Sequence, residues 1–273
     1  MSYEDLKRKT VIVTGGVLGI GREIVNSFAE NFSNVVVADI NEKGRDLVNQ
    51  LSGGEQRHLF VQTNVTDLSS VERMVKLVLA TYGRIDVLVN NAGINMPRLL
   101  VDPQEPQGKY ELGEKEFDKM VAVNQKGPYL CTQAVVRAMI NQKTKGVVVN
   151  IASECGLEGS QGQSCYAATK GALYAFTRSW AKELGKYNIR VVGVAPGILE
   201  ATAIRTLEYE QALAYTRGIT VEQLRASYEK VSIPLARVGK LREIANLVCF
   251  LSSNEAGYIT GTTYNISGGK TRG

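Results

Sequence analysis

The chain has 273 residues, of which 44% are hydrophobic, and a formal net charge of +5. It contains no apolar run approaching the ~20 residues of a membrane-spanning helix, and residues 1–10 are too polar for a signal peptide. We therefore expect one soluble, cytoplasmic domain, residues 1–273, with a large core and no membrane partner. The charge favours an anionic small molecule but is too small and too scattered to indicate a nucleic-acid partner.

Short runs of β-branched residues alternate with longer amphipathic segments through most of the chain. The pattern predicts strands near 10–14, 34–39, 58–63, 85–90, 146–152, 189–194 and 263–266, with helices between them. This alternation is typical of the α/β class, and predicts a single Rossmann-type doubly wound parallel sheet of about seven strands with helices on both faces.

Two segments interrupt this alternation. Residues 95–113 contain three prolines and predict a long loop, and residues at about 198–234 insert amphipathic segments where a short connection would be enough. Long excursions at the carboxyl ends of parallel strands usually carry substrate specificity. We therefore expect the second segment to form a helical lid over the substrate.

The first predicted strand leads into a glycine-rich turn and then into an amphipathic helix. Gly15, Gly19 and Gly21, with Ile20 between the last two, allow the backbone to turn tightly and approach a pyrophosphate at the helix N-terminus. Asp39, at the end of the second predicted strand, lies where a carboxylate binds the adenosine ribose and repels a 2′-phosphate. The predicted cofactor is therefore NAD rather than NADP, although Lys43 is a nearby cation that would favour NADP.

Polar residues and glycines also follow the third and fourth predicted strands, at the edge of the sheet where a dinucleotide would lie. Asn and Gly at strand ends often only form turns, but the run Asn90-Asn91-Ala92-Gly93 favours close approach of the backbone to a cofactor. The predicted cofactor contacts here are Asn64, Val65, Asn91, Ala92 and Gly93.

Ser153, Tyr166 and Lys170 form the candidate catalytic group. Tyr166 and Lys170 are four residues apart in a helical pattern over 164–186 and therefore share one face. An adjacent ammonium favours phenolate and would bring the pKa of Tyr166 from about 10 toward the working range of an acid/base. Ser153, which follows the buried run 146–152, offers a hydroxyl to a substrate oxygen. Tyr3 and Lys7 show the same spacing in a polar terminus, so the spacing alone is weak evidence.

Taken together, these motifs resemble the short-chain dehydrogenase/reductase family over nearly the whole chain. The motifs are Thr14-Gly15-x-x-x-Gly19-x-Gly21, Asn90-Asn91-Ala92-Gly93, Asn124, Ser153, Tyr166-x-x-x-Lys170 and Pro196-Gly197.

The resemblance implies hydride transfer at C4 of nicotinamide. It further implies that Lys170 also holds the nicotinamide ribose and that Asn124 anchors a water-linked proton path. Pro196, Gly197 and Ile198 would line the nicotinamide end of the cofactor site, and a homotetramer is the usual assembly. The predicted last strand, 263–266, would place the C-terminal tail at the sheet edge, in keeping with such an assembly.

The chain departs from the family pattern at two positions. Asn64 stands where Asp is frequent, but its oxygen can still accept from the adenine amino group. Ala201, followed by Thr202, stands where a Thr usually contacts the carboxamide, which leaves the orientation of the nicotinamide less defined.

Segments 196–202, 209–220 and 268–273 further resemble those members of the family that oxidise phosphorylated polyols to ketose phosphates. A phosphate dianion is best held by arginine, whose planar group donates two parallel hydrogen bonds. We rank Arg205 first, because it begins the lid segment eight residues after Gly197, and Arg98 second. Arg217, Arg225 and Arg237 also lie on these segments.

Several other functions are compatible with parts of the sequence. A Ser-His-Asp hydrolase would need His58, the single histidine, which lies at the start of a predicted strand away from the site. An extended NAD-dependent epimerase would show a different glycine spacing, and a 3-oxoacyl carrier-protein reductase usually uses NADPH. A dehydrogenase of another sugar phosphate and an NAD-sensing regulatory protein remain alternatives. The four cysteines lack metal-like spacing, so we expect no metal.

Overall fold

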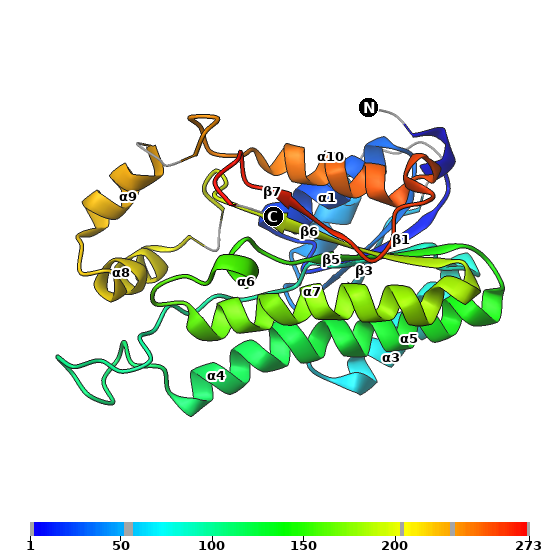
Figure 1. Cartoon of the computed structure of the whole chain (residues 1–273). Coiled ribbons are helices and arrows are strands. Elements are labelled where there is room, and N and C mark those ends of the chain that lie inside the picture. Colours follow the sequence, from blue (N-terminus) through cyan, green and yellow to red (C-terminus); the bar gives the residue numbers. More distant parts are fainter. Residues whose placement is uncertain (1–2, 52–56, 203–204, 230–232, 272–273) are drawn as a thin grey trace.

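The computed structural model describes residues 3–51, 57–202, 205–229 and 233–271 (Figure 1). Within these residues seven strands form one parallel sheet in the order β3-β2-β1-β4-β5-β6-β7. The strands are β1 (Thr10–Thr14), β2 (Asn34–Asp39), β3 (Leu59–Gln62), β4 (Val87–Asn90), β5 (Gly146–Ile151), β6 (Ile189–Pro196) and β7 (Thr263–Ile266). The predicted doubly wound α/β fold is confirmed.

The strands are rich in valine because both faces of the sheet are covered. Successive side chains point to opposite faces, so Val11 and Val13 join one buried core while Ile12, between them, joins the other. All three side chains are fully buried. The two cores hold the sheet rigid, and its carboxyl edge becomes a fixed platform for the loops.

Helices cover both faces of this sheet (Figure 1). Helix α1 (Gly19–Glu30) packs against α10 (Leu241–Ser252) on one face, and α3 (Leu68–Tyr82), α5 (Gly127–Gln142) and α7 (Ser164–Leu184) lie on the other. The remaining helices are α2 (Gly44–Gln50), α4 (Glu114–Val121), α6 (Cys155–Glu158), α8 (Leu207–Thr216) and α9 (Val221–Glu229). Short 3-10 turns occur at Glu4–Leu6, Gly185–Tyr187 and Asn254–Ala256, and a π-helical turn, Ala122–Lys126, joins α4 to α5.

The segment predicted as a lid contains α8 and α9, which lie apart from the sheet (Figure 1). Leu213, Ala214 and Leu224 give these helices a small core of their own. The Tyr215 hydroxyl donates to Asp102 Oδ2 at 2.7 Å, and the Tyr215 ring stacks on that of Tyr110. The lid is thereby attached to the long 95–113 loop. Residues 203–204 and 230–232 of the lid segment, and 272–273 of the C-terminal tail, lie outside the described residues.

None of the helices in the described part of the chain combines the length and the apolar character that crossing a membrane requires.

Candidate active site

The glycine turn after β1 forms a cradle that excludes side chains. Gly15 and Gly19 have positive φ values of 64° and 56°, which only glycine adopts readily. A Cβ at position 21 would lie 2.1 Å from the carbonyl oxygen of Gly15, and a Cβ at position 15 would lie 2.8 Å from Cα of Ala92. The first turn of α1 therefore presents bare backbone N–H groups, with Ile20 in that turn, and the cradle fits a pyrophosphate.

The carboxyl end of β4 is bonded directly to this cradle. Thr14 Oγ1 accepts from the backbone N–H groups of Asn91, at 3.0 Å, and Ala92, at 3.1 Å. Asn91 Nδ2 donates to the carbonyl oxygens of Thr14 and Gly15. The sequence predicts cofactor roles for Asn91, Ala92 and Gly93, and the structure places them in one unit with the glycine turn.

Asp39 ends β2 directly beside the cradle. Its Oδ2 accepts from the backbone N–H of Val17, within the glycine turn, and its Oδ1 accepts from that of Asn41, both at 3.0 Å. These bonds fix a carboxylate where a ribose would lie. The side chain of Lys43 is exposed, and among the described residues it forms no ion pair that would draw it toward Asp39.

Asn64 and Val65 follow β3, which ends two residues earlier, at Gln62. Asn64 is exposed, and its Oδ1 accepts from both the backbone N–H and the hydroxyl of Thr66. Val65 is buried against Gly127. The exposed amide can still contact a ligand, whereas Val65 can do so only through its backbone.

Pro196 is the last residue of β6, and the turn after it closes over the same edge of the sheet. Gly197 donates its N–H to Ile266 O at 3.1 Å, and Ile198 lines a cavity described below. The side chain of Thr202 comes within 3.4 Å of the position that a Cβ of Gly19 would occupy. Thr202, adjacent to Ala201, therefore places a hydroxyl-bearing side chain over the glycine turn.

Ser153, Tyr166 and Lys170 meet between β5 and α7. Ser153 is buried two residues beyond the end of β5, and its hydroxyl lies close enough to the Tyr166 phenol to lower the pKa of that phenol. Lys170 Nζ donates to Ile151 O at 2.7 Å and lies 5.7 Å from the centre of the Tyr166 ring. The structure thus brings together the three residues that the sequence predicts to act as a group.

Burial governs the ionisation of this pair. It lowers the pKa of Lys170 to about 8, because the cation loses its hydration inside the protein. Burial also raises the pKa of Tyr166, and the Ser153 hydroxyl offsets this only in part. The expected lowering of the Tyr166 pKa toward neutrality is therefore wrong for the protein alone, because loss of hydration has the largest effect on that pKa. At neutral pH the phenol is protonated.

Asn124 lies in the π-helical turn between α4 and α5 and is fully buried. Its Oδ1 accepts from the N–H of Ile94, while its Nδ2 donates to Ile94 O and to Thr169 Oγ1. The side chain thus joins α7 to the loop that follows β4. Single π-helical turns are frequently found at functional sites, and a sequence pattern of ordinary helical period does not reveal them.

A cavity of about 270 Å³ opens in front of Tyr166. Such a volume lies just below the roughly 300–1,000 Å³ of sites for drug-sized ligands and therefore suits one small molecule. Its walls come from the α6 region, the turn after β6, the lid and the C-terminal tail. Lining residues include Asn95, Ser153, Glu154, Glu158, Gln163, Ile198, Arg205, Tyr209, Arg217, Tyr228 and Lys270.

The two arginines that the sequence suggests for phosphate binding, Arg205 and Arg98, line different cavities. Arg205 lines the cavity, where its Nη2 donates to Leu199 O at 3.0 Å. Arg98 instead lines a neighbouring cavity, donates from Nη1 to Pro97 O, and lies over the ring of Tyr110. Of these two arginines, only Arg205 lines the same cavity as Tyr166.

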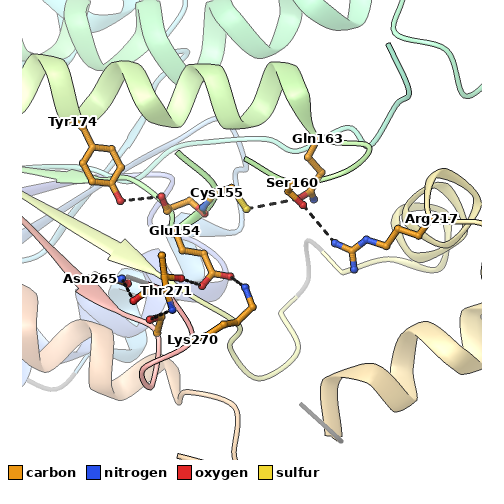
Figure 2. A network of polar contacts seen from close by, with 11 residues as sticks. Glu154, Cys155, Ser160, Gln163, Tyr174, Arg217, Asn265, Lys270 and Thr271 are labelled. Atoms are coloured by element: carbon orange, nitrogen blue, oxygen red, sulfur yellow. Dashed lines mark hydrogen bonds and ion pairs between the residues drawn. The ribbon is translucent and has the colours of Figure 1, made fainter. Parts of the chain in front are cut away.

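The C-terminal tail contributes residues that the sequence interpretation missed. Glu154, directly after Ser153, is buried and forms an ion pair at 2.6 Å between its Oε1 and Lys270 Nζ. Thr271 Oγ1 donates to Glu154 Oε2 at 2.5 Å (Figure 2). Tyr174 on α7 donates to Ser153 O. Glu154 and Lys270 are 116 positions apart, so no local pattern signals the contact.

His58 and metal ligands play no part in this arrangement. His58 Nδ1 accepts from the N–H of Val35 at 3.3 Å, on the far side of the sheet order from β5, and the residue does not line the cavity. A Ser-His-Asp triad is therefore excluded. In the described residues no group of three or more His, Cys, Asp or Glu side chains has the geometry of a metal site.

Comparison with known proteins agrees with this geometry. The model of the short chain dehydrogenase family matches residues 9–212. A sorbitol-6-phosphate 2-dehydrogenase of Klebsiella pneumoniae is 55% identical over 272 residues, covering 100% of this chain and 99% of that protein.

Two solved structures are also similar. A short-chain type dehydrogenase/reductase from Mycobacterium marinum is 28% identical, with a TM-score of 0.83 over 99% of this chain and 98% of that one. A 3-ketoacyl-(acyl-carrier-protein) reductase from Brucella melitensis, complexed with NADH, is 28% identical, with a TM-score of 0.80 over 98% of this chain and 100% of that one.

Proposed function

This chain belongs to the short-chain dehydrogenase family, and from that premise we propose that it catalyses the reversible oxidation of D-sorbitol 6-phosphate to D-fructose 6-phosphate with NAD⁺. The observation that carries the proposal is that Ser153 and Tyr166 line one small cavity that also has arginine in its wall. Full-length similarity to a sorbitol-6-phosphate 2-dehydrogenase supports the choice of substrate.

When bound, the nicotinamide ring supplies a hydride acceptor or donor at C4. The glycine turn with Gly15, Gly19, Ile20 and Gly21 would hold the pyrophosphate of the dinucleotide. Further contacts would come from Asp39, Asn64 and Val65 at the adenosine, from Asn91, Ala92 and Gly93 along the strand edge, and from Tyr166, Lys170, Pro196, Gly197 and Ile198 at the nicotinamide end.

Tyr166 moves the proton at the reacting oxygen. Burial keeps its phenol protonated at neutral pH, which is the state that delivers a proton to the carbonyl oxygen of fructose 6-phosphate. In the oxidation direction the phenolate must accept the proton of the polyol hydroxyl. The rate of oxidation should therefore increase as the pH rises. Ser153 bonds the same substrate oxygen and stabilises the charge that develops on it.

Lys170 and Asn124 support this proton transfer. The Lys170 ammonium lies close enough to Tyr166 to favour phenolate when it is charged, and it is the proposed ligand of the nicotinamide ribose. Asn124 uses its side chain to fix Ile94 and Thr169, so it positions the loop beside the cofactor while serving the proposed proton path.

Two features bear on the polyol phosphate itself. Asn95 Oδ1 is buried without a hydrogen-bond partner among the described residues, and Asn95 lines the cavity, where a polyol hydroxyl can donate to that oxygen. For the phosphate we keep Arg205 as the proposed ligand. Arg98, the second choice, would reach the substrate only if the phosphate extended into the neighbouring cavity.

We propose NAD rather than NADP because the Asp39 carboxylate is fixed beside the glycine turn, and a carboxylate at the end of the second strand repels a 2′-phosphate. We further propose a homotetramer in the cytoplasm, with residues 1–273 acting as one catalytic domain.

The alternatives to the proposed activity are a dehydrogenase of another polyol or sugar phosphate and a 3-oxoacyl carrier-protein reductase. The second is disfavoured by Asp39 and by the small cavity. An NAD-sensing protein would not need the complete catalytic group.

The deciding experiment follows NADH formation at 340 nm with NAD⁺ and a panel of free and phosphorylated polyols. We expect the highest kcat/KM with D-sorbitol 6-phosphate, and NADH formation rather than NADPH formation by more than tenfold. A higher kcat/KM with another polyol phosphate would identify that compound as the substrate instead. Activity confined to 3-oxoacyl thioesters with NADPH would refute the proposal.

A further inference from the structure

Three cationic side chains line the catalytic cavity, but they differ in their partners. Lys270 is neutralised by Glu154 at 2.6 Å. Arg205 and Arg217 have no carboxylate within ion-pairing distance among the described residues, although Glu158, exposed to solvent, lines another part of the wall.

Other arginines of the same region do have carboxylate partners. Arg225 on α9 pairs with Glu210 at 2.6 Å, and Arg237 pairs with Glu243 at 2.6 Å. The unpaired arginines are thus the ones that face the cavity. An anion entering the cavity would meet two guanidinium groups that no protein carboxylate competes for.

Tyr228 lines the cavity together with these two arginines. Arg205 stacks over the Tyr228 ring, with Cζ 4.3 Å from the ring centre. Burial raises the pKa of Tyr228, the positive charges of Arg205 and Arg217 lower it, and the carboxylate of Glu210 raises it.

Arg217 reaches the cavity from the C-terminal end of α8. Its Nη2 extends toward Ser160 Oγ at a long 3.5 Å (Figure 2). Such a weak contact leaves most of its donors free. Figure 2 also shows Lys270 bonded to Glu154 on the other side of the view, at the tail of the chain. The free positive charge of the cavity therefore lies on the lid side.

We propose that Arg205, Arg217 and Tyr228 together form the binding site for the phosphate dianion of the substrate. This inference rests on the proposed function for the identity of the phosphorylated substrate. It adds Arg217 and the Tyr228 hydroxyl to Arg205, and it places the phosphate at the lid and the reacting carbon toward Tyr166.

The test compares D-sorbitol 6-phosphate with free D-sorbitol in four variants, R205Q, R217Q, the double variant and Y228F. Each arginine variant is expected to lose about ten- to hundredfold in kcat/KM for the phosphorylated substrate, with less than threefold change for sorbitol. Y228F should lose roughly three- to tenfold on the phosphorylated substrate. R217K should recover part of the loss, because lysine restores the charge but not the planar pair of donors.

R225Q is the comparator, because Arg225 lies on the same lid but is paired with Glu210. R225Q should change kcat/KM for both substrates by the same factor. If R205Q and R217Q also change both substrates equally, the arginines only hold the lid together and the inference is overturned. No loss on either substrate overturns it as well.

A second readout separates this inference from the proposed function. Inorganic phosphate should raise the Tm of the wild-type protein and leave that of the double variant unchanged, whichever polyol phosphate is the substrate. This result supports the anion site even if sorbitol 6-phosphate proves not to be the substrate. An equal rise in both proteins overturns the anion site and leaves the dehydrogenase activity to be judged by its own assay.

Discussion

The ammonium of Lys170 lies 5.7 Å from the centre of the Tyr166 ring, one helical turn further along α7. Its Nζ also donates to Ile151 O at the end of β5. The helix that carries the phenol is thereby bonded to the strand that leads to Ser153. Because Lys170 is buried and Tyr166 is half-buried beside it, their protonation states affect both the direction of proton transfer and part of the stability of the fold.

Removing the phenolic hydroxyl tests the acid/base role. Tyr166→Phe should lose at least about 10²-fold in kcat, since a positioned acid/base typically contributes 10²–10⁴-fold. The Kd for NADH, measured by fluorescence titration, should remain within a factor of about three of the wild-type value, because the ring and Lys170 are kept. Near-normal turnover by this variant would rule out Tyr166 as the proton donor.

The buried lysine predicts a pH-dependent stability. Between pH of about 8 and 10.5 the unfolded chain holds the Lys170 proton while the folded protein releases it, so stability rises with pH in this window. Below about pH 8 the cost of burying the cation is fully present. The free energy of unfolding of Lys170→Met, relative to that of wild type, should therefore be most favourable at pH 7. Above pH 8 this difference should fall by up to about 1.4 kcal/mol per pH unit.

Urea unfolding of both proteins from pH 6.5 to 10.5 measures this difference. Subtracting the two curves cancels the titration of all other groups that the substitution does not affect. A difference that stays constant over the whole range would show that Lys170 keeps an ordinary pKa in the folded protein.

Asp39 should determine the choice between the two dinucleotides. Asp39→Ala removes the carboxylate proposed to bind the adenosine ribose, and so should lower kcat/KM with NAD⁺ by about tenfold, the equivalent of ~1.4 kcal/mol, and raise it with NADP⁺. Steady-state kinetics with both cofactors measure the ratio. If the preference for NAD⁺ survives unchanged, another residue selects the cofactor.

The tight approach of α1 to the cradle predicts that Gly21 accepts no side chain. In Gly21→Ala the new Cβ would meet Gly15 O at 2.1 Å and Asn91 Nδ2 at 2.5 Å, so the cradle must open. We expect loss of NADH binding and destabilisation of about 1–3 kcal/mol.

Gly185→Ala is the matched control for this substitution. Nothing lies within 4 Å of its Cβ position, and its φ is −56°. It should be neutral or stabilise the protein by about 0.4–1 kcal/mol through the unfolded state. Calorimetric unfolding and NADH titration of both variants provide the comparison, and equal behaviour would mean that the cradle is not closely packed.

The ion pair between Glu154 and Lys270 should couple the tail to the catalytic loop. Lys270→Met leaves the buried carboxylate without its cation and should cost about 3 kcal/mol, whereas Glu154→Gln with Lys270→Met should cost less than the sum of the single changes. A double-mutant cycle in urea gives the coupling energy. Additive single effects would show that the pair contributes nothing of its own.

Most of the fold could be predicted because its signals are local. Valine-rich runs bounded by polar turns located all seven strands within a few residues, since buried parallel strands require continuous apolar sequence. The glycine turn and Asp39 were predictable for a similar reason: backbone conformation and strand-end position depend on neighbouring residues in the chain.

Features that depend on distant residues could not be predicted in this way. Glu154 meets Lys270 only because β5 and β7 end at the same edge of the sheet, with β6 between them. The degree of burial around Tyr166 reversed the expected direction of its pKa, because sequence spacing identifies the nearby charge but not the loss of water. Likewise, only the folded loop reveals that Arg98 faces a different cavity from Arg205.

The attachment of the C-terminal tail to Glu154 bears on how the protein can be handled. Thr271 donates its hydroxyl to Glu154, which lines the cavity, so a bulky group attached close to Thr271 would lie beside that cavity. The described N-terminal residues begin near α1 and α10, away from that cavity (Figure 1). Reporter groups are therefore better attached near the described N-terminal residues, and immobilisation through a residue close to Thr271 should lower activity.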